Sequence, residues 1–299
     1  MNKFNPLGLS QDGKTITLHR LDLDSMTQFP KYLKPDSTDW IEQNRDLIRV
    51  ASVIDVETTG LEQERDEIIE VGVRQFQFNR ETGEILSIGN FYSAFQDPGF
   101  PLSEEIQNLT GITDELVKGQ KIHWETLDQC LGRSHLIIAH NASFDRPFID
   151  AKSKVSSEKI WGCSLKQIDW AKKGLSSQKL EALCHSHGFF NDAHRALSDA
   201  DSLIYLLSLT DQNLQTPYFF ELITEARKPS VMVHAKFAPF EVKDALRGRK
   251  YRWDPTQKVW SKVISKDLAD QETEWLTTEI YQGKFRGQIE EILPKDQFK

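Results

Sequence analysis

Cysteine is scarce in this sequence: it has three among 299 residues, and none of them lies in a C-x-x-C pair. An odd, scattered set of this kind predicts neither a disulfide framework nor a zinc site. Cys130, Cys163 and Cys184 are therefore expected to be small buried side chains of a protein in the reducing cytoplasm.

Long apolar runs and an excess of positive charge are also missing. No stretch approaches the roughly 18–20 apolar residues that a membrane-spanning helix needs. Residues 1–6 are largely polar and do not form the apolar core of a signal peptide, so export by that route is not expected. The formal net charge is −8 at pH 7. Such a protein is not expected to coat nucleic acid without regard to sequence, although a local basic site stays possible.

Three regions differ in pattern. Residues 1–48 carry interrupting prolines and are interpreted as an N-terminal extension. Residues 49–210 begin with three strand patterns and continue with alternating short strands and helices, which predicts an α/β sheet of mixed direction. Residues 211–299 form a C-terminal appendage of different composition. Strands are expected at 50–57, 67–78, 84–95, 136–139 and 159–163, and helices at 165–172, 178–187 and 195–209.

Two acids lie two positions apart inside an apolar, β-branched run. Residues i and i+2 of a strand project from the same face, so Asp55 and Glu57 are expected side by side. Adjacent carboxylates repel each other unless something positive lies between them, and a divalent metal ion is a natural partner. On this stretch alone, a solvated strand with two exposed acids is an equal alternative.

Two later acids could supply further ligands. Asp145 follows a short apolar strand and lies in the first turn of a helix expected to start near Ser143. Asp199 lies in an otherwise apolar helix, where an unpaired charge is costly, so it needs a partner. His194 precedes it by five positions, a rotation of about 140° on a regular helix, so the two cannot share one face. We expect His194 on the incoming loop.

These residues, taken in order, resemble a known family. Residues 55–60 (Asp-Val-Glu-Thr-Thr-Gly), residues 141–145 (Asn-Ala-Ser-Phe-Asp), and His194 followed by four residues and Asp199 are similar to the three motifs of the DEDDh exonucleases. This is the 3′→5′ proofreading type that includes the epsilon subunit of bacterial DNA polymerase III. The resemblance covers about residues 49–209. Asp192 and Asp201 lie off the motif spacing and are expected to be solvated.

The resemblance implies a ribonuclease-H-like fold, with a mixed five-stranded sheet flanked by helices, and two-metal phosphodiester hydrolysis. Asp55, Glu57 and Asp199 would hold two Mg²⁺ or Mn²⁺ ions, with Asp145 completing the shell directly or through water. His194 would take the proton from the attacking water, a task that suits an imidazole, whose ordinary pKa is about 6.5. Substrate contacts are expected from Thr58, Thr59, Gly60, Asn141 and Phe144.

The resemblance therefore implies a metal-dependent exonuclease that acts at the 3′ ends of single-stranded or frayed DNA and releases nucleoside 5′-monophosphates. An exoribonuclease is an alternative, because the choice of sugar depends on the pocket around the 2′ position. Another alternative is an inactive exonuclease fold that binds nucleic acid or serves as an adaptor. All five catalytic positions are filled, which argues against the inactive form.

The segment from residue 227 to residue 262 has ten basic and three acidic residues. Trp253 and Trp260 flank a Pro-containing turn in an expected hairpin, and an acidic amphipathic helix is expected at about 266–281. Aromatic rings interleaved with Arg and Lys can stack on bases and contact phosphates. Alternatively, the two tryptophans form the core of a small domain. A replication or repair protein could also dock on this segment.

Overall fold

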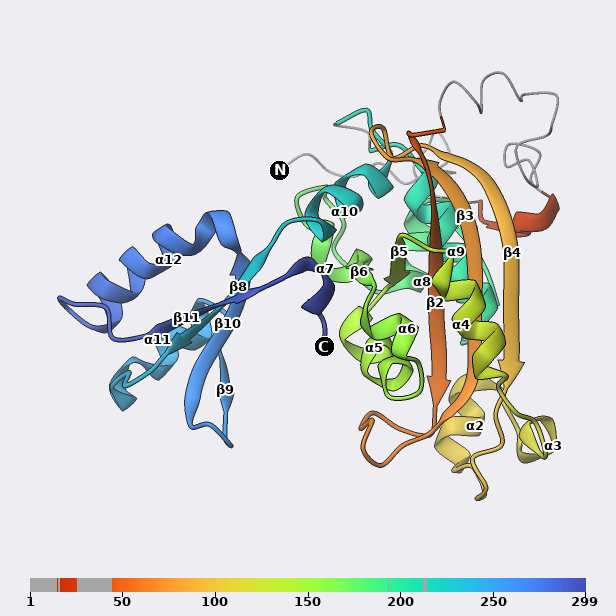
Figure 1. The fold of residues 1–299 in the computed structure, drawn as a ribbon, viewed down its shortest axis with the longest axis horizontal. Helices are drawn as coiled ribbons and strands as arrows, with labels where there is room; N and C mark the ends of the chain where they lie inside the picture. The colour runs from red at the N-terminus through yellow and green to blue at the C-terminus, as the bar shows by residue number, and fades with distance from the viewer. Residues whose placement is uncertain (1–14, 16, 26–44, 193, 212–213) are drawn as a thin grey trace. The chain divides into compact units, whose positions relative to one another are not determined.

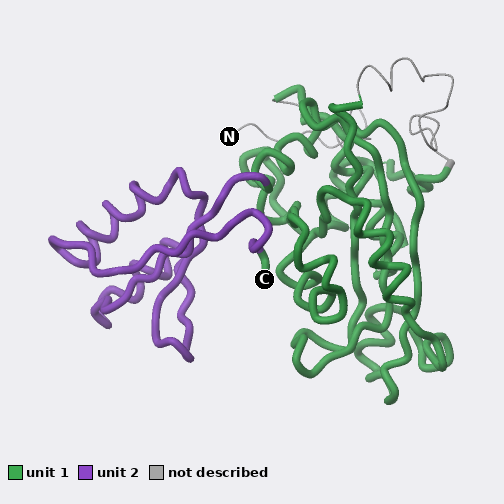
Figure 2. The backbone as a smooth tube through the Cα atoms, in the orientation of Figure 1, with its two compact units in different colours: residues 1–226, 298–299 green, residues 227–297 purple. Residues whose placement is uncertain are grey.

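The computed structural model describes residues 15, 17–25, 45–192, 194–211 and 214–299. The chain divides into two compact units, residues 1–226 with 298–299, and residues 227–297 (Figures 1 and 2). The division falls after Ala226, later than the boundary expected at residue 210. The reason is that α10 (Tyr218–Ala226) contributes buried side chains to the core of the first unit. Most of the expected extension 1–48 lies outside the described residues.

The first unit is built on a mixed five-stranded sheet in the order β4-β3-β2-β5-β6 (Figure 1). Its strands are β2 (Ile48–Thr58), β3 (Ile68–Asn79), β4 (Ile85–Phe95), β5 (Leu136–Ala139) and β6 (Ile160–Cys163). The pairs β2/β3 and β3/β4 are antiparallel, whereas β2/β5 and β5/β6 are parallel. The predicted α/β class and the mixed direction of the sheet are therefore confirmed.

Helices and short connections complete this unit. They are α2 (Glu104–Thr110), α3 (Asp114–Val117), α4 (Trp124–Gly132), α5 (Ala142–Asp150), α6 (Lys154–Ser157), α7 (Ser164–Gln167), α8 (Leu180–Ser186), α9 (Ala196–Ser208) and α10. The helix expected at 165–172 is reduced to α7, because the backbone of Ile168 is extended. Among the helices that the structure describes, none is both long and apolar enough to cross a membrane.

A short N-terminal segment joins the same unit. The strand β1 (His19–Arg20) pairs in parallel with β7 (Phe189–Phe190), and the 3₁₀ turn η1 (Leu23–Ser25) follows it. Leu23 of this turn is buried in the main core. The segment therefore lies against the loop that leads from β7 into α9.

The two faces of β2 bury different sets of neighbours. Ala51 and Val53 pack in a core with residues of α9 and α10, while Ile54 and Val56 pack in a second core with residues of α4 and α5. Side chains alternate along a strand, so Asp55 and Glu57 project from the face that carries Ala51 and Val53. The two acids are thus directed toward the face that α9 covers.

The polar residues of β3 face the same helix rather than water. Glu70, Gly72 and Arg74 pair with Glu57, Asp55 and Val53 of β2, and they share the face that α9 covers. The exposed fractions of Glu70 and Arg74 are only 1% and 3%. The alternation in this strand therefore separates two buried faces, one of which is lined by charged side chains.

The second unit is a four-stranded antiparallel sheet in the order β11-β8-β10-β9. Its elements are β8 (Ser230–Ala235), η3 (Phe240–Val242), α11 (Lys243–Gly248), β9 (Arg252–Asp254), β10 (Val259–Ser265), η4 (Lys266–Leu268), α12 (Ala269–Trp275), the π-helical turn η5 (Leu276–Ile280), β11 (Gln288–Ile292) and η6 (Pro294–Asp296). The hairpin and the acidic helix expected from the sequence are both present. Its core consists of Val231, Val233, Ala235, Leu246, Tyr251, Leu276 and Ile280.

Candidate active site

Three carboxylates meet where the first turn of α9 reaches the end of β2. One oxygen from each of Asp55, Glu57 and Asp199 lies within 4.8 Å of the other two. The alternation of β2 directs the first two toward α9, and Asp199 comes from the helix that covers them. The structure thus brings together three of the acids that the sequence singled out.

Close approach and burial make this cluster electrostatically costly without a cation. Burial and the neighbouring acids Asp145, Asp199 and Glu57 raise the pKa of Asp55 well above its ordinary value. The same two causes raise the pKa of Glu57 to about 8. Burial also raises the pKa of Asp199. A divalent cation among these oxygens would remove the repulsion, and carboxylate oxygens are the ligands that Mg²⁺ and Mn²⁺ prefer.

Both oxygens of Asp199 are oriented by the loop before α9. Asn191 donates from Nδ2 to Oδ1 at 2.8 Å, and the backbone N–H of His194 donates to Oδ2 at 2.9 Å. His194 is exposed and has a φ of 61°, in the left-handed region. The expectation that it precedes the helix on a loop holds. Its backbone conformation brings its N–H to the carboxylate that Asn191 also holds.

Asp145 contacts the backbone of β2. It is 3% exposed in the first turn of α5, and its Oδ1 accepts a hydrogen bond from the backbone N–H of Val56 at 3.2 Å. Burial raises its pKa to about 7. Among the described residues, the group of oxygens within 4.8 Å does not include this carboxylate. Its charge still raises the pKa values of Asp55 and Glu57.

The turn after β2 is closed by its own side chains. The hydroxyl of Thr58 donates to the carbonyl of Gly60, and that of Thr59 donates to Asp66 at 3.1 Å. The Thr59 oxygen also accepts from the backbone N–H of Glu67. A Cβ at Gly60 would lie 2.5 Å from the Asp66 carboxylate. Both hydroxyls are thus used inside the turn, together with the Thr59 N–H, which donates to the Glu67 carbonyl at 2.9 Å.

The other two expected substrate contacts lie at the start of α5. Asn141 is exposed at the N-cap, where its side chain makes no capping bond. Phe144 is half-buried, with its ring 5.3 Å from that of Phe148. The helix begins at Ala142, one residue before the expected start near Ser143. The Ser143 hydroxyl accepts a hydrogen bond from Lys166.

Sequence reasoning missed the residues that fix α9 over β3. A Cβ at Gly72 would lie 2.2 Å from the backbone nitrogen of Leu197, so only glycine lets the helix approach this closely. Beside it, Glu70 accepts from the Arg195 guanidinium at 3.1 Å and from the Ala196 backbone N–H at 3.2 Å. A glycine inside a strand pattern is a known sign of close backbone approach, and it could have drawn attention to this position.

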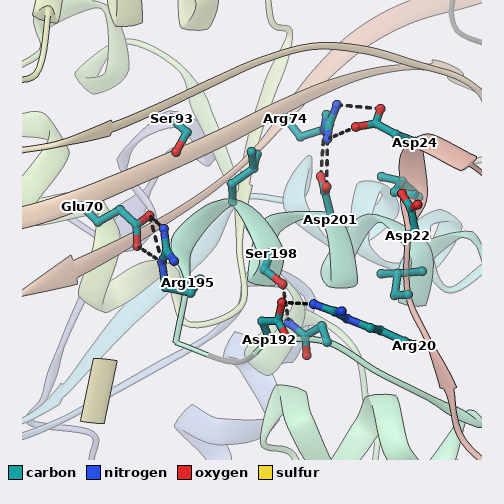
Figure 3. A pocket seen from close by; sticks show the side chains of 14 residues that line it. Arg20, Asp22, Asp24, Glu70, Arg74, Ser93, Asp192, Arg195, Ser198 and Asp201 are labelled. Atoms are coloured by element: carbon teal, nitrogen blue, oxygen red, sulfur yellow. Dashed lines mark hydrogen bonds and ion pairs between the residues drawn. The ribbon is translucent and has the colours of Figure 1, made fainter. Parts of the chain in front are cut away.

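A pocket of about 650 Å³ lies next to the cluster, between β3, the segment after β1 and α9 (Figure 3). Most of its acids face arginines. Glu70 meets Arg195, Asp192 meets Arg20, and Asp201 meets Arg74 at 2.8 Å. The Asp192 side chain is 63% exposed, whereas that of Asp201 is 17% exposed. The expectation that Asp201 is solvated is therefore wrong. Burial raises its pKa, and the Arg74 guanidinium opposes that rise.

Residues 52–207 match the family model of the RNase T exonucleases, and this stretch contains the carboxylate cluster and His194. The chain belongs to this exonuclease family. The match runs from β2, which carries Asp55 and Glu57, to α9, which carries Asp199. The predicted relationship to exonucleases is thus confirmed at the level of the family.

The exonuclease region is similar to part of bacterial polymerases named DNA polymerase III PolC-type. It is 37% identical over 166 residues to that of Listeria monocytogenes and 33% identical over 168 residues to that of Halalkalibacterium halodurans. Each match covers 52% of this chain and 11% of the relative, so the chain spans only about a tenth of these proteins.

Two solved exonucleases are also similar. Exonuclease X in complex with 5′ overhanging duplex DNA is 24% identical, with a TM-score of 0.38, and the match covers 57% of this chain and 99% of that one. E. coli exonuclease I in complex with a dA16 oligonucleotide is 14% identical, with a TM-score of 0.46, and the match covers 83% and 64%.

Proposed function

We propose that the chain is a metal-dependent 3′→5′ exonuclease that acts on single-stranded or frayed DNA ends and releases nucleoside 5′-monophosphates. The observation that carries the proposal is the group of three carboxylates within 4.8 Å, inside the region matched by the exonuclease family. Their raised pKa values mark a site with more negative charge than its surroundings neutralise. A replication role fits the names of the relatives, and a cytoplasmic location fits such a role.

The donor set suits hard divalent cations. Asp55, Glu57 and Asp199 would hold two Mg²⁺ or Mn²⁺ ions, with Asp145 completing the shell directly or through water. When bound, such ions stabilise the attacking and leaving oxygens and lower the pKa of a bound water. The remaining tasks, which are orienting the ligands and moving a proton, belong to the chain itself.

His194 is the proposed general base. It lies on the loop that holds Asp199, and its exposed imidazole can receive a proton from water at the edge of the cluster. The backbone N–H of the same residue donates to Asp199, so this contact holds the backbone of the proposed base next to the ligand. The loop is held in turn by Asn191 and by the pairing of β7 with β1.

The terminal nucleotide is proposed to lie against the turn after β2 and the start of α5. Thr58, Thr59 and Gly60 lie in that turn. The Thr59 N–H already donates to the Glu67 carbonyl and the Gly60 carbonyl accepts from Thr58, so the proposed contacts use the remaining backbone groups of these residues. Asn141 offers an exposed amide, and Phe144 offers part of a ring face to a base. These contacts recognise the end of a nucleic-acid strand and do not depend on its base sequence.

The test uses oligonucleotides of DNA and RNA, each labelled at the 3′ or the 5′ end, with Mg²⁺, Mn²⁺ or EDTA. We expect metal-dependent shortening from the 3′ end of DNA, with nucleoside 5′-monophosphates as products. Asp55→Asn, purified in the same way, controls for contaminating nucleases. Faster shortening of RNA would favour an exoribonuclease, and no shortening with any metal would overturn the enzymatic proposal.

A further inference from the structure

The second unit carries a row of alternating rings and cations that the exonuclease site does not use. We call Phe240, Lys243, Arg247, Trp260 and Trp253 the aromatic–basic row. The Lys243 ammonium lies 4.2 Å from the centre of the Phe240 ring, and the Arg247 guanidinium lies 5.7 Å from that of Trp260. The Trp260 and Trp253 ring centres are 5.6 Å apart. Lys243 and Arg247 are one turn apart on α11, so the contacts form a continuous line.

The outer members of the row lie outside the core of the second unit. Phe240 is 75% exposed and Trp253 is 47% exposed, and neither belongs to the core of the second unit. Trp260 is partly buried against that core. The sequence left open whether the two tryptophans form a core or face a ligand. Trp260 supports the core, whereas Trp253 faces outward. Exposed large rings gathered in one place commonly mark a binding surface.

The basic residues of this unit also fall into two kinds. Arg249 and Lys262 point inward and contact the buried Glu272, at 3.0 Å and 3.4 Å. Arg247 instead lies near the exposed Asp244 at 3.6 Å, with side-chain exposures of 64% and 79%. An exposed pair of this kind contributes little, so a phosphate can replace the carboxylate. Arg247 is thus a cation that the row presents to solvent, and Lys243 lies half-buried one turn earlier on α11.

We propose that the aromatic–basic row binds a single strand of nucleic acid, with bases stacked on its rings and phosphates held by Lys243 and Arg247. Every base has a face that can stack, and cations between the rings match the negative charge that recurs along the strand. A paired duplex would hide those faces. The proposal concerns binding alone and does not depend on hydrolysis at the carboxylate cluster.

The test measures binding of a fluorescent 20-nucleotide poly-dT to the full chain in EDTA, by anisotropy at several salt concentrations. Loss of one stacked ring in Trp253→Ala should weaken binding about 5- to 100-fold. The double variant Lys243→Ala/Arg247→Ala should weaken binding and flatten its salt dependence by about 0.7 per lost phosphate contact. The matched control is Lys266→Ala/Leu268→Ala, which removes an exposed cation and an exposed apolar side chain of the same unit outside the row.

Two further measurements separate failure of this inference from loss of stability in a variant and from failure of the exonuclease proposal. Trp253→Phe keeps a stacking ring, so it should retain most of the affinity even if the alanine variant is less stable. Cleavage of a trinucleotide with Mg²⁺ reports on the exonuclease proposal separately, and Trp253→Ala should leave that rate unchanged. Unchanged poly-dT affinity in both row variants would overturn the inference, whatever the trinucleotide assay shows. Binding of a protein partner through the row, with no effect on poly-dT, would overturn it equally.

Discussion

Two groups of acids lie against the same helix, and they differ in what faces them. In the pocket of Figure 3, Glu70, Asp192 and Asp201 each meet an arginine. In the cluster at the end of β2, Asp55, Glu57 and Asp199 meet one another, and Asp199 is oriented by hydrogen bonds from an amide and a backbone N–H. The first group is neutralised within the chain, whereas the second is arranged for a cation from outside.

Asp199 and Asp201 show the contrast most directly. They are two residues apart on α9, and two helical positions turn by about 200°, so they face different neighbours. Asp199 joins the cluster, while Asp201 pairs with Arg74, whose side chain is 3% exposed. Asp199 is therefore expected to serve catalysis and to lower the stability of the metal-free fold. Asp201 is expected to stabilise the fold without a part in catalysis.

Replacing these two acids in parallel should give opposite results. Asp199→Asn should lower exonuclease activity at least about a hundredfold, because it removes a charge that holds the proposed cations, and it should not destabilise the metal-free fold. Asp201→Asn should retain activity but lower the free energy of unfolding by about 3 kcal/mol, because Asp24 is then the acidic partner left to Arg74 among the described residues. Activity assays and urea unfolding measure the two effects. Similar losses of activity in both variants would contradict the division between the groups.

The closeness of α9 to β3 can be tested at Gly72. Gly72→Ala places a Cβ 2.2 Å from the Leu197 backbone, so the helix must move and carry Asp199 away from Asp55. We expect a loss of about 1–3 kcal/mol in stability, together with most of the activity. Gly132→Ala is the control, because its nearest neighbour to a new Cβ is a Val155 methyl at 3.9 Å. Normal activity in Gly72→Ala would show that the separation of helix and strand is not critical.

The sequence predicted the strands well because alternation is a local property. It also predicted that Asp55 and Glu57 share a face, since this needs only the period of a strand. That Asp199 meets them came from the family resemblance. Local pattern does not say which helix packs on which face of a sheet.

The supporting residues could not be found for the same reason. Glu70 and Arg74 look solvent-facing in an alternating strand, yet both are buried beneath α9 by pairs that join residues far apart in the chain. Asn191 shows no motif at all, because its importance depends on a loop conformation. Only Gly72 carried a local sign, a glycine inside a strand pattern.

Asn191 is expected to act through Asp199 rather than on substrate. Its amide fixes one carboxylate oxygen, so Asn191→Ala should weaken Mn²⁺ binding about 10-fold or more and raise the metal concentration needed for activity. Calorimetric titration with Mn²⁺ measures this apart from turnover. The neighbouring Asp192→Ala removes only the exposed pair with Arg20 and should leave metal affinity unchanged. Equal effects in the two variants would point to the loop as a whole rather than to the amide.

The excess negative charge of the cluster should also make the stability of the fold depend on pH. The pKa of Glu57 is raised from its ordinary 4.5 to about 8, so between these values the folded chain binds a proton that the unfolded chain does not. The free energy of unfolding of the metal-free protein should therefore fall as the pH rises from about 4.5 to 8. Each kcal/mol lost should lower the melting temperature by about 2–4 °C.

Mn²⁺ should reverse that loss, and it should do so more at pH 8 than at pH 5.5, where protons already neutralise part of the cluster. Melting curves in EDTA and in Mn²⁺ at the two pH values measure the difference. Glu57→Gln should reduce both the pH dependence and the metal effect, whereas Asp201→Asn should keep the metal effect, because Asp201 pairs with Arg74 rather than with the cluster. A melting temperature in EDTA that rises over this interval would mean that the cluster is neutralised by the chain itself, like the arginine-paired group beside it.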